Sequence, residues 1–122
     1  MRIRRQEFAL LVRRALKELP PAFRARLAGV DVVIEDAPSA ELRQELGLEP
    51  GELLFGLYDG TPLTHPDRYG APWRMPDRII LFQRTFERTG TSPQEVLEEV
   101  RRTVIHEVGH HFGLSEDKLE DV

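Results

Sequence analysis

The chain has 122 residues, a formal net charge of −4 at pH 7, 40% hydrophobic and 31% charged residues, and no cysteine. This length fits one domain, so we expect a single domain over residues 1–122. The acidic balance argues against a general nucleic-acid binder, and the lack of cysteine excludes disulfides and thiolate metal ligands. Neither a signal peptide nor an apolar run long enough to cross a bilayer is recognisable in the sequence. We therefore expect a cytoplasmic protein that does not enter membranes.

The first part of the chain predicts three helical segments and one strand. Residues 1–19 form an amphipathic helix, and its basic face is interpreted as solvated rather than as a membrane-binding or partner-binding surface. Pro20-Pro21 ends this helix, and residues 22–27 form a short helical turn. Residues 30–35 are rich in β-branched side chains and predict the first strand. Residues 40–46 predict another short helix. The apolar face of the first helix consists of Phe8, Leu11, Val12, Ala15, Leu16 and Leu19.

Two further strands are expected in the middle of the chain. Residues 52–58 predict a mostly buried second strand, in which Gly56 marks a bulge or a close backbone approach. Residues 78–83 predict a third strand, expected at the sheet edge, where an extended peptide can pair with it. Residues 85–90 lead into the last helix. These elements predict an α+β fold, with a small mixed sheet packed on the N-terminal helix and on a long C-terminal helix.

A long loop over residues 59–77 separates the second and third strands. A loop of this length in a small domain is usually functional or disordered. Its aromatic residues Tyr69 and Trp73 fit either a substrate-binding flap or a hairpin connection that covers the core. His65 is a candidate metal ligand, although a loop histidine is more often exposed to solvent.

The last helix has strong start and stop signals. Ser92 is the expected N-cap, Pro93 takes the first helical position, and Glu95 completes a capping box. Apolar residues follow at helical spacing, and Gly113 is the expected left-handed stop. The sequence therefore predicts a helix over residues 93–112. Its apolar face consists of Val96, Leu97, Val100, Val104, Val108 and Phe112.

Near the end of this helix, His106 and His110 are four residues apart and therefore lie on one face. That spacing allows both imidazoles to bind one zinc ion at ~2.0–2.1 Å each. Glu107 is rotated by about 100° around the helix, where its carboxylate can reach a water on the metal. Two imidazoles, a water and a carboxylate base are the parts of a hydrolytic zinc site. His111 is expected to point away from the metal and to pack or to form a surface hydrogen bond.

A catalytic zinc ion usually takes three protein ligands. A ligand on a separate downstream helix would need more than the twelve residues that follow His110. The other known arrangement uses a glycine bend three residues after the second histidine, with the ligand three residues further on. Gly113 fits the bend and Glu116 fits the ligand position. Asp117 is the alternative third ligand, because the turn conformation can favour either carboxylate.

Residues 106–116 (HEVGHHFGLSE) resemble the signature of the compact bacterial zincin-like metallopeptidases, which have a reduced metzincin, or matrix-metalloproteinase-like, fold. The resemblance extends upstream to residues 57–64 (LYDGTPLT) and 76–82 (PDRIILF). It implies a zincin-like fold, with an acidic residue in place of the third histidine, and a zinc-dependent site that hydrolyses a peptide or protein substrate. In that reaction Glu107 serves as the general base.

The sequence also departs from larger metzincins. Larger metzincins carry a methionine turn after the third ligand, and a downstream segment forms the lower wall of their substrate cleft. In this sequence the only methionines are Met1 and Met75, and no such downstream segment is expected. An alternative function therefore stays open, namely a zinc-binding interaction or regulatory module with little or no proteolytic turnover.

Overall fold

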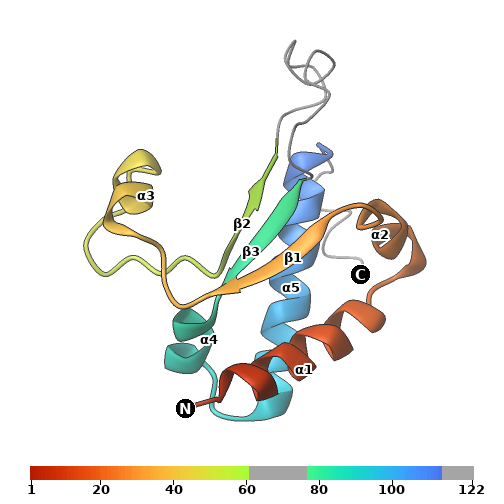
Figure 1. The fold of residues 1–122 in the computed structure, drawn as a ribbon, viewed down its shortest axis with the longest axis horizontal. Helices are drawn as coiled ribbons and strands as arrows, with labels where there is room; N and C mark the ends of the chain where they lie inside the picture. Colours follow the sequence, from red (N-terminus) through yellow and green to blue (C-terminus); the bar gives the residue numbers. More distant parts are fainter. Residues whose placement is uncertain (61–76, 114–122) are drawn as a thin grey trace.

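A computed structural model describes residues 1–60 and 77–113 (Figure 1). In these residues the chain forms a small three-stranded sheet and five helices. The sequence predictions for His65, Tyr69 and Trp73 and for Glu116 and Asp117 lie outside the described residues. The elements are α1 (Arg5–Lys17), α2 (Pro21–Arg26), β1 (Asp31–Glu35), α3 (Ala40–Glu45), β2 (Gly56–Asp59), β3 (Arg78–Phe82), α4 (Gln83–Thr89) and α5 (Pro93–His111).

The sheet is mixed, with the strand order β1-β3-β2. Strand β1 runs parallel to β3, and β2 runs antiparallel to it. The predicted mixed sheet is confirmed, but the prediction that residues 78–83 form an edge strand is wrong, because β3 has a partner on both sides. A parallel pair needs a long crossover, and here the crossover from β1 to β3 contains both α3 and β2. Among the described strands, β2 therefore lies at the edge of the sheet, and it lies beside α5 (Figure 1).

The central position of β3 agrees with its composition. All four residues from Ile79 to Phe82 are at most 5% exposed. A strand with a neighbour on each side and with both faces covered is expected to be continuously apolar. The apolar run that we interpreted as an edge strand is thus the pattern of a central one.

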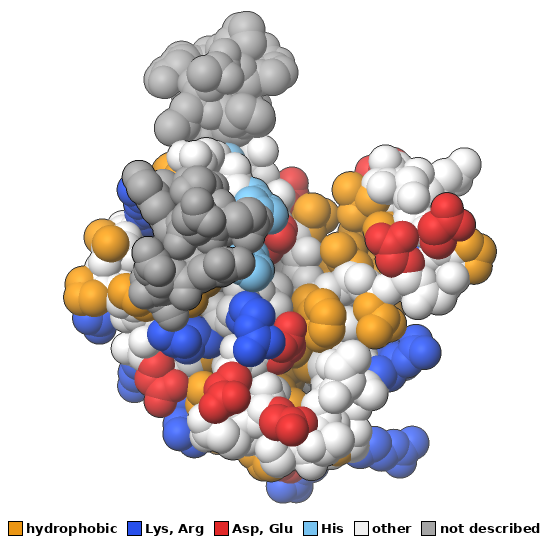
Figure 2. All heavy atoms as spheres, turned by 180° about the vertical axis from the view of Figure 1, so that it is seen from behind, with side chains coloured by type: hydrophobic (Ala, Val, Ile, Leu, Met, Phe, Trp, Pro, Cys, Tyr) orange, Lys and Arg blue, Asp and Glu red, His pale blue; other side chains and the backbone are white. Residues whose placement is uncertain are grey.

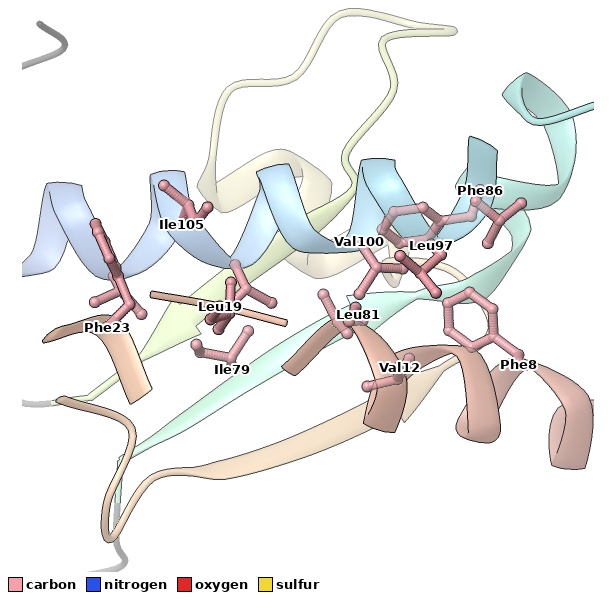
Figure 3. Packing of buried hydrophobic residues seen from close by; sticks show 14 of the residues in the cluster. Phe8, Val12, Leu19, Phe23, Ile79, Leu81, Phe86, Leu97, Val100 and Ile105 are labelled. Atoms are coloured by element: carbon pink, nitrogen blue, oxygen red, sulfur yellow. The ribbon is translucent and has the colours of Figure 1, made fainter. Parts of the chain in front are cut away.

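The main core lies between α1, α5 and the inner face of the sheet (Figure 3). The predicted apolar face of α1 is largely confirmed, since Phe8, Val12 and Ala15 are buried and the exposed arginines lie opposite them. Phe112, which caps the C-terminus of α5, departs from the prediction because it is 37% exposed. No helix of the described segments has the length and apolar character needed to cross a membrane. The buried cluster contains Ile3, Phe8, Val12, Ala15, Leu19, Phe23, Ile79, Leu81, Phe86, Val96, Leu97, Val100, Val104, Ile105 and Val108.

Two predictions for the middle of the chain need correction. The second strand is shorter than predicted, because it begins at Gly56 and Leu53 is 40% exposed. Helix α4 was not predicted, although its Phe86 is completely buried. The close approach expected at Gly56 is confirmed, since a Cβ there would lie 2.9 Å from Thr103 Cγ2 and 3.0 Å from the Ile80 carbonyl oxygen. This contact brings β2 directly against α5.

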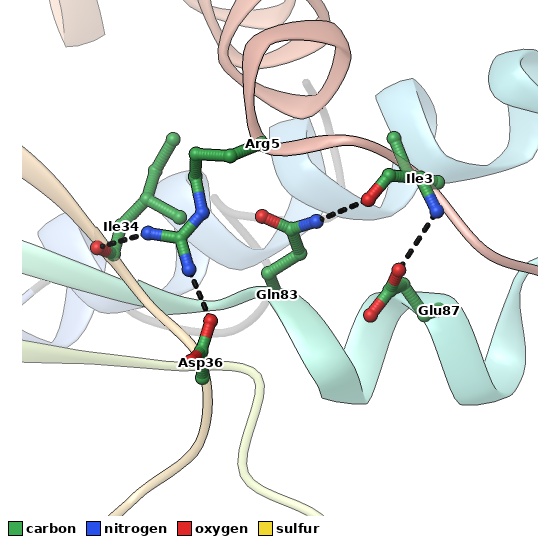
Figure 4. Close-up of polar contacts among 6 residues, drawn as sticks. All are labelled: Ile3, Arg5, Ile34, Asp36, Gln83 and Glu87. Carbon is green, nitrogen blue, oxygen red and sulfur yellow. Dashed lines mark hydrogen bonds and ion pairs between the residues drawn. The ribbon is translucent and has the colours of Figure 1, made fainter.

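Hydrogen bonds join the N-terminal segment to α4 and to the end of β1 (Figure 4). The Ile3 N–H donates to Glu87 Oε2 at 2.7 Å, and Gln83 Nε2 donates to the Ile3 carbonyl at 2.7 Å. Arg5 donates to the Ile34 carbonyl at 3.0 Å and pairs with Asp36. These bonds fix the start of α1 at the end of the sheet remote from the C-terminus of α5 (Figure 1).

Candidate metal centre

Helix α5 begins and ends close to the predicted positions. The Ser92 hydroxyl accepts a hydrogen bond from the Glu95 N–H at 3.1 Å, and Pro93 takes the first helical position. The Glu95 carboxylate departs from the predicted capping box, because it accepts from the N–H and hydroxyl of Thr91 instead of from the N-cap residue. The helix ends at His111, one residue earlier than predicted. Gly113 has a φ of 72°, so the predicted left-handed residue that ends the helix is confirmed.

The last two turns of α5 present His106 and His110 on one side of the helix. Their ring centroids are 6.2 Å apart and their planes differ by only 6°. His106 is half-buried and His110 is exposed, and histidine side chains reach the surface in Figure 2. The side chains of the two predicted ligands therefore point in the same direction, one helical turn apart, at an accessible end of the helix.

The carboxylate of Glu107 is placed by the edge strand. Glu107 is half-buried, and its Oε1 accepts a hydrogen bond from the Tyr58 N–H at 3.0 Å. Burial raises the pKa of this carboxyl above its usual value, and the Tyr58 N–H and the nearby His110 and His106 oppose that rise. A carboxylate with a raised pKa is a better proton acceptor near neutral pH than an ordinary surface glutamate.

The direction of the Tyr58 N–H follows from the register of the sheet. Phe55 accepts a hydrogen bond from the Phe82 N–H at 2.9 Å, so Phe55 faces β3 with its main-chain groups. Antiparallel strands alternate between bonded and non-bonded residues. The main-chain groups of Gly56 and Tyr58 therefore point away from β3, and the Tyr58 N–H meets Glu107. Periodicity identifies side chains that share a face, and a main-chain donor from a distant strand leaves no such signal in the sequence.

The described residues include two of the predicted zinc ligands, His106 and His110. His106 and His110 offer imidazole nitrogens, a donor type that zinc binds, and the chain has no cysteine that could compete with them. Within residues 1–60 and 77–113 no cluster of three or more histidine, aspartate or glutamate side chains is arranged to hold a metal. The predicted third ligands, Glu116 and Asp117, lie outside the described part of the chain. The donor chemistry fits zinc, and the ligand set stays a prediction.

Comparisons with known proteins agree with this architecture. A search of the curated proteins found no match. A solved structure of a conserved hypothetical protein from T. thermophilus is similar, with a TM-score of 0.57 and 29% identity over 88% of this chain and 92% of that one. The family model described as "Zincin-like metallopeptidase" matches residues 27–122, which include both histidines, β2 and β3. The chain therefore belongs to the zincin-like metallopeptidase family.

Proposed function

We propose that the protein is a zinc-dependent peptidase with a reduced, metzincin-like active site. His106 and His110 would hold the zinc ion together with Glu116 or, alternatively, Asp117. A zinc ion in this site would lower the pKa of a bound water to ≈ 7 and polarise a peptide carbonyl. The observation that carries the proposal is the position of Glu107, a half-buried carboxylate between the two histidines in sequence that is fixed by a strand-edge N–H.

Glu107 acts as the proton carrier in this proposal. Its raised pKa lets it take a proton from the attacking water near neutral pH and deliver that proton to the nitrogen of the departing amine. The hydrogen bond from the Tyr58 N–H to Oε1 restrains one carboxylate oxygen. The other oxygen, Oε2, then has a defined direction for proton transfer.

The substrate in this proposal is an extended peptide that pairs with the outer edge of β2 through main-chain groups other than the Tyr58 N–H, which already donates to Glu107. Gly56 and Tyr58 point their main-chain groups away from β3, and β2 packs against α5 beside the histidines. A peptide that adds to a sheet edge binds through its main chain, so this geometry fits a peptide better than a small molecule. It also assigns to β2 the role that the sequence alone had given to β3.

The test is a Glu107→Gln variant of the zinc-loaded protein, measured against a peptide library. Glutamine keeps the size and the oxygen that accepts from Tyr58, but it cannot carry the proton. Cleavage should fall by 10²–10⁴-fold, while zinc content by elemental analysis stays equal to that of the wild type. Glu99→Gln is the matched control, since it makes the same change on the same helix two turns earlier and should leave cleavage unaltered.

Two results would contradict the peptidase proposal. Equal cleavage by the wild type and Glu107→Gln would remove Glu107 from the reaction. Zinc binding by the wild type without cleavage of any peptide in the library would instead favour the zinc-binding interaction or regulatory module.

A further inference from the structure

A second polar cluster lies directly beside the candidate metal centre. The Tyr58 ring stacks on His111, with centroids 3.9 Å apart and planes that differ by 15°. The Tyr58 hydroxyl donates to Asp77 Oδ2 at 3.0 Å, and His111 Nε2 lies 3.8 Å from the same oxygen. We call Tyr58, Asp77 and His111 the Tyr58 cluster. Its members come from the edge strand, from the residue before the central strand, and from the last turn of α5.

The Tyr58 cluster is enclosed. The side chains of His111 and Asp77 are only 12% and 10% exposed. Gly60 lies so close to Asp77 that a Cβ there would be 2.5 Å from the carboxyl carbon. Placing polar groups in such an environment costs free energy unless hydrogen bonds compensate for it. None of the three residues belongs to the proposed ligands or to the proton carrier, so catalysis as proposed above does not account for the cluster.

The position of His111 indicates what the cluster does. His111 is the final residue of α5 and directly follows His110. The last turn of a helix lacks some main-chain hydrogen bonds and tends to fray. On its other side, the His111 ring meets Phe112 edge to face at 5.1 Å, and the Arg26 guanidinium of α2 lies 5.1 Å above the Phe112 ring. The helix end is thus held from both sides, by β2 and by α2.

We propose that Tyr58 and Asp77 are positioning residues of the metal centre, because they hold His111 and thereby fix the last turn of α5, which carries His110 and leads into the bend at Gly113. This inference rests on the proposed zinc site. The contacts of Tyr58 and Asp77 with His111 determine the direction of the His110 ring and the point at which the chain leaves the helix toward the predicted third ligand. Tyr58 also donates its main-chain N–H to Glu107, so one residue restrains both the base and the helix end.

The test measures the zinc dissociation constant of Tyr58→Leu by competition with a chromogenic chelator. Leucine removes the stacked ring and the hydroxyl but keeps the main-chain N–H that binds Glu107. The expected result is a loss of zinc affinity of about 10-fold, the lower end of the effect of groups that orient metal ligands. Tyr58→Phe keeps the ring but loses the hydroxyl that donates to Asp77, so it should restore only part of the lost affinity. Asp77→Asn, which can still accept from Tyr58, should lose less than Tyr58→Leu but should still bind zinc more weakly than the wild type.

Phe55→Leu is the matched control. Phe55 is also a partly buried aromatic residue packed on the core, but it lies just before β2, where it contacts Phe86. We expect it to lower the unfolding temperature of the metal-free protein by an amount similar to that of Tyr58→Leu, with the zinc affinity of the folded protein unchanged. Equal loss of affinity in both variants, or none in either, would overturn the positioning role and leave only a contribution to stability.

The experiment separates this inference from the proposed function. Zinc affinity is measured without a substrate, so the positioning role can be tested in a protein that cleaves nothing. If Tyr58→Leu does not fold, the comparison of Tyr58→Phe and Asp77→Asn with the wild type decides, because wild-type affinity in both would contradict the role of the hydroxyl–carboxylate contact. Failure of the wild type to bind zinc would overturn both proposals.

Discussion

The two halves of α5 are held by different kinds of contact. The first half, residues 93–104, is capped by its own neighbour Ser92 and buries Val96, Leu97, Val100 and Val104 against α1, α4 and the sheet. The second half is held by residues far away in the sequence, since Tyr58 binds Glu107 and stacks on His111, and Arg26 covers Phe112. The first half contributes most of the helix's buried core side chains, and the second half carries the residues of the proposed site. Changes in the two halves should therefore have separable effects.

The largest effect on stability is expected from Leu97→Ala in the first half. Leu97 is 1% exposed and lies in the core beside Phe8 and Phe86 (Figure 3). The cavity and the lost burial should lower the free energy of unfolding by about 3 kcal/mol. Urea unfolding of the metal-free protein measures this. Zinc affinity of the folded fraction should stay at the wild-type value.

Leu10→Ala is the control for that change. Leu10 is 57% exposed on α1, so the same substitution there should alter the free energy of unfolding by less than about 0.5 kcal/mol. If folded Leu97→Ala protein binds zinc more weakly than the wild type, the two halves of α5 are coupled, and their effects are not separable as we expect.

The next largest effect is expected from the two candidate third ligands. If Glu116 binds zinc, Glu116→Gln should weaken zinc binding by more than the 10–100-fold that is typical of residues outside the ligand shell, and Asp117→Asn should not. The reverse result would assign Asp117. Titration with a chelator measures the affinity. Wild-type affinity in both single variants would contradict the predicted ligand set.

The features that the sequence predicts are those that depend on neighbouring residues, as in the first half of α5. Local signals locate α5, its Ser92 cap and the bend at Gly113, because each depends on residues within one or two turns. They also place His106, Glu107 and His110 together, since a helix fixes the spacing of side chains. The shared end of α5 on which the proposed chemistry depends was therefore predictable.

Contacts between distant segments were not predictable. Strand order depends on which elements the crossover contains, so β3 was wrongly expected at the edge. Helix α4 is only seven residues long and follows β3 without a loop or a capping side chain, so it gave no start signal. The Tyr58 N–H is a main-chain group that every residue except proline supplies. Its bond to Glu107 arises only from the packing of β2 on α5.

A smaller effect is expected at the start of α5. Ser92→Ala removes the hydroxyl that accepts from the Glu95 N–H and should lower the free energy of unfolding by about 1 kcal/mol. Because the cap lies at the far end of α5 from the histidines, zinc affinity should not change. Ser92→Asp, which can still accept this hydrogen bond, should retain most of the stability. Equal losses in the alanine and aspartate variants would show that the hydroxyl does not act as a cap.

The smallest effect concerns the pH dependence of stability in the metal-free protein. Burial raises the folded-state pKa of Glu107, so folding favours its protonated form. That favourable contribution is complete below the unfolded pKa of about 4.3 and is lost as the pH rises through the raised folded value. Relative to the wild type, Glu107→Gln should therefore gain stability as the pH rises from about 4, and the gain should level off above the raised folded pKa. Urea unfolding in a chelator buffer measures this difference, with Glu99→Gln as the control for loss of a charge on the same helix. The prediction is wrong if the difference in free energy of unfolding between Glu107→Gln and the wild type is independent of pH or falls as the pH rises. The Tyr58 N–H and the two histidines would then outweigh burial, and the folded-state pKa of Glu107 would not be raised.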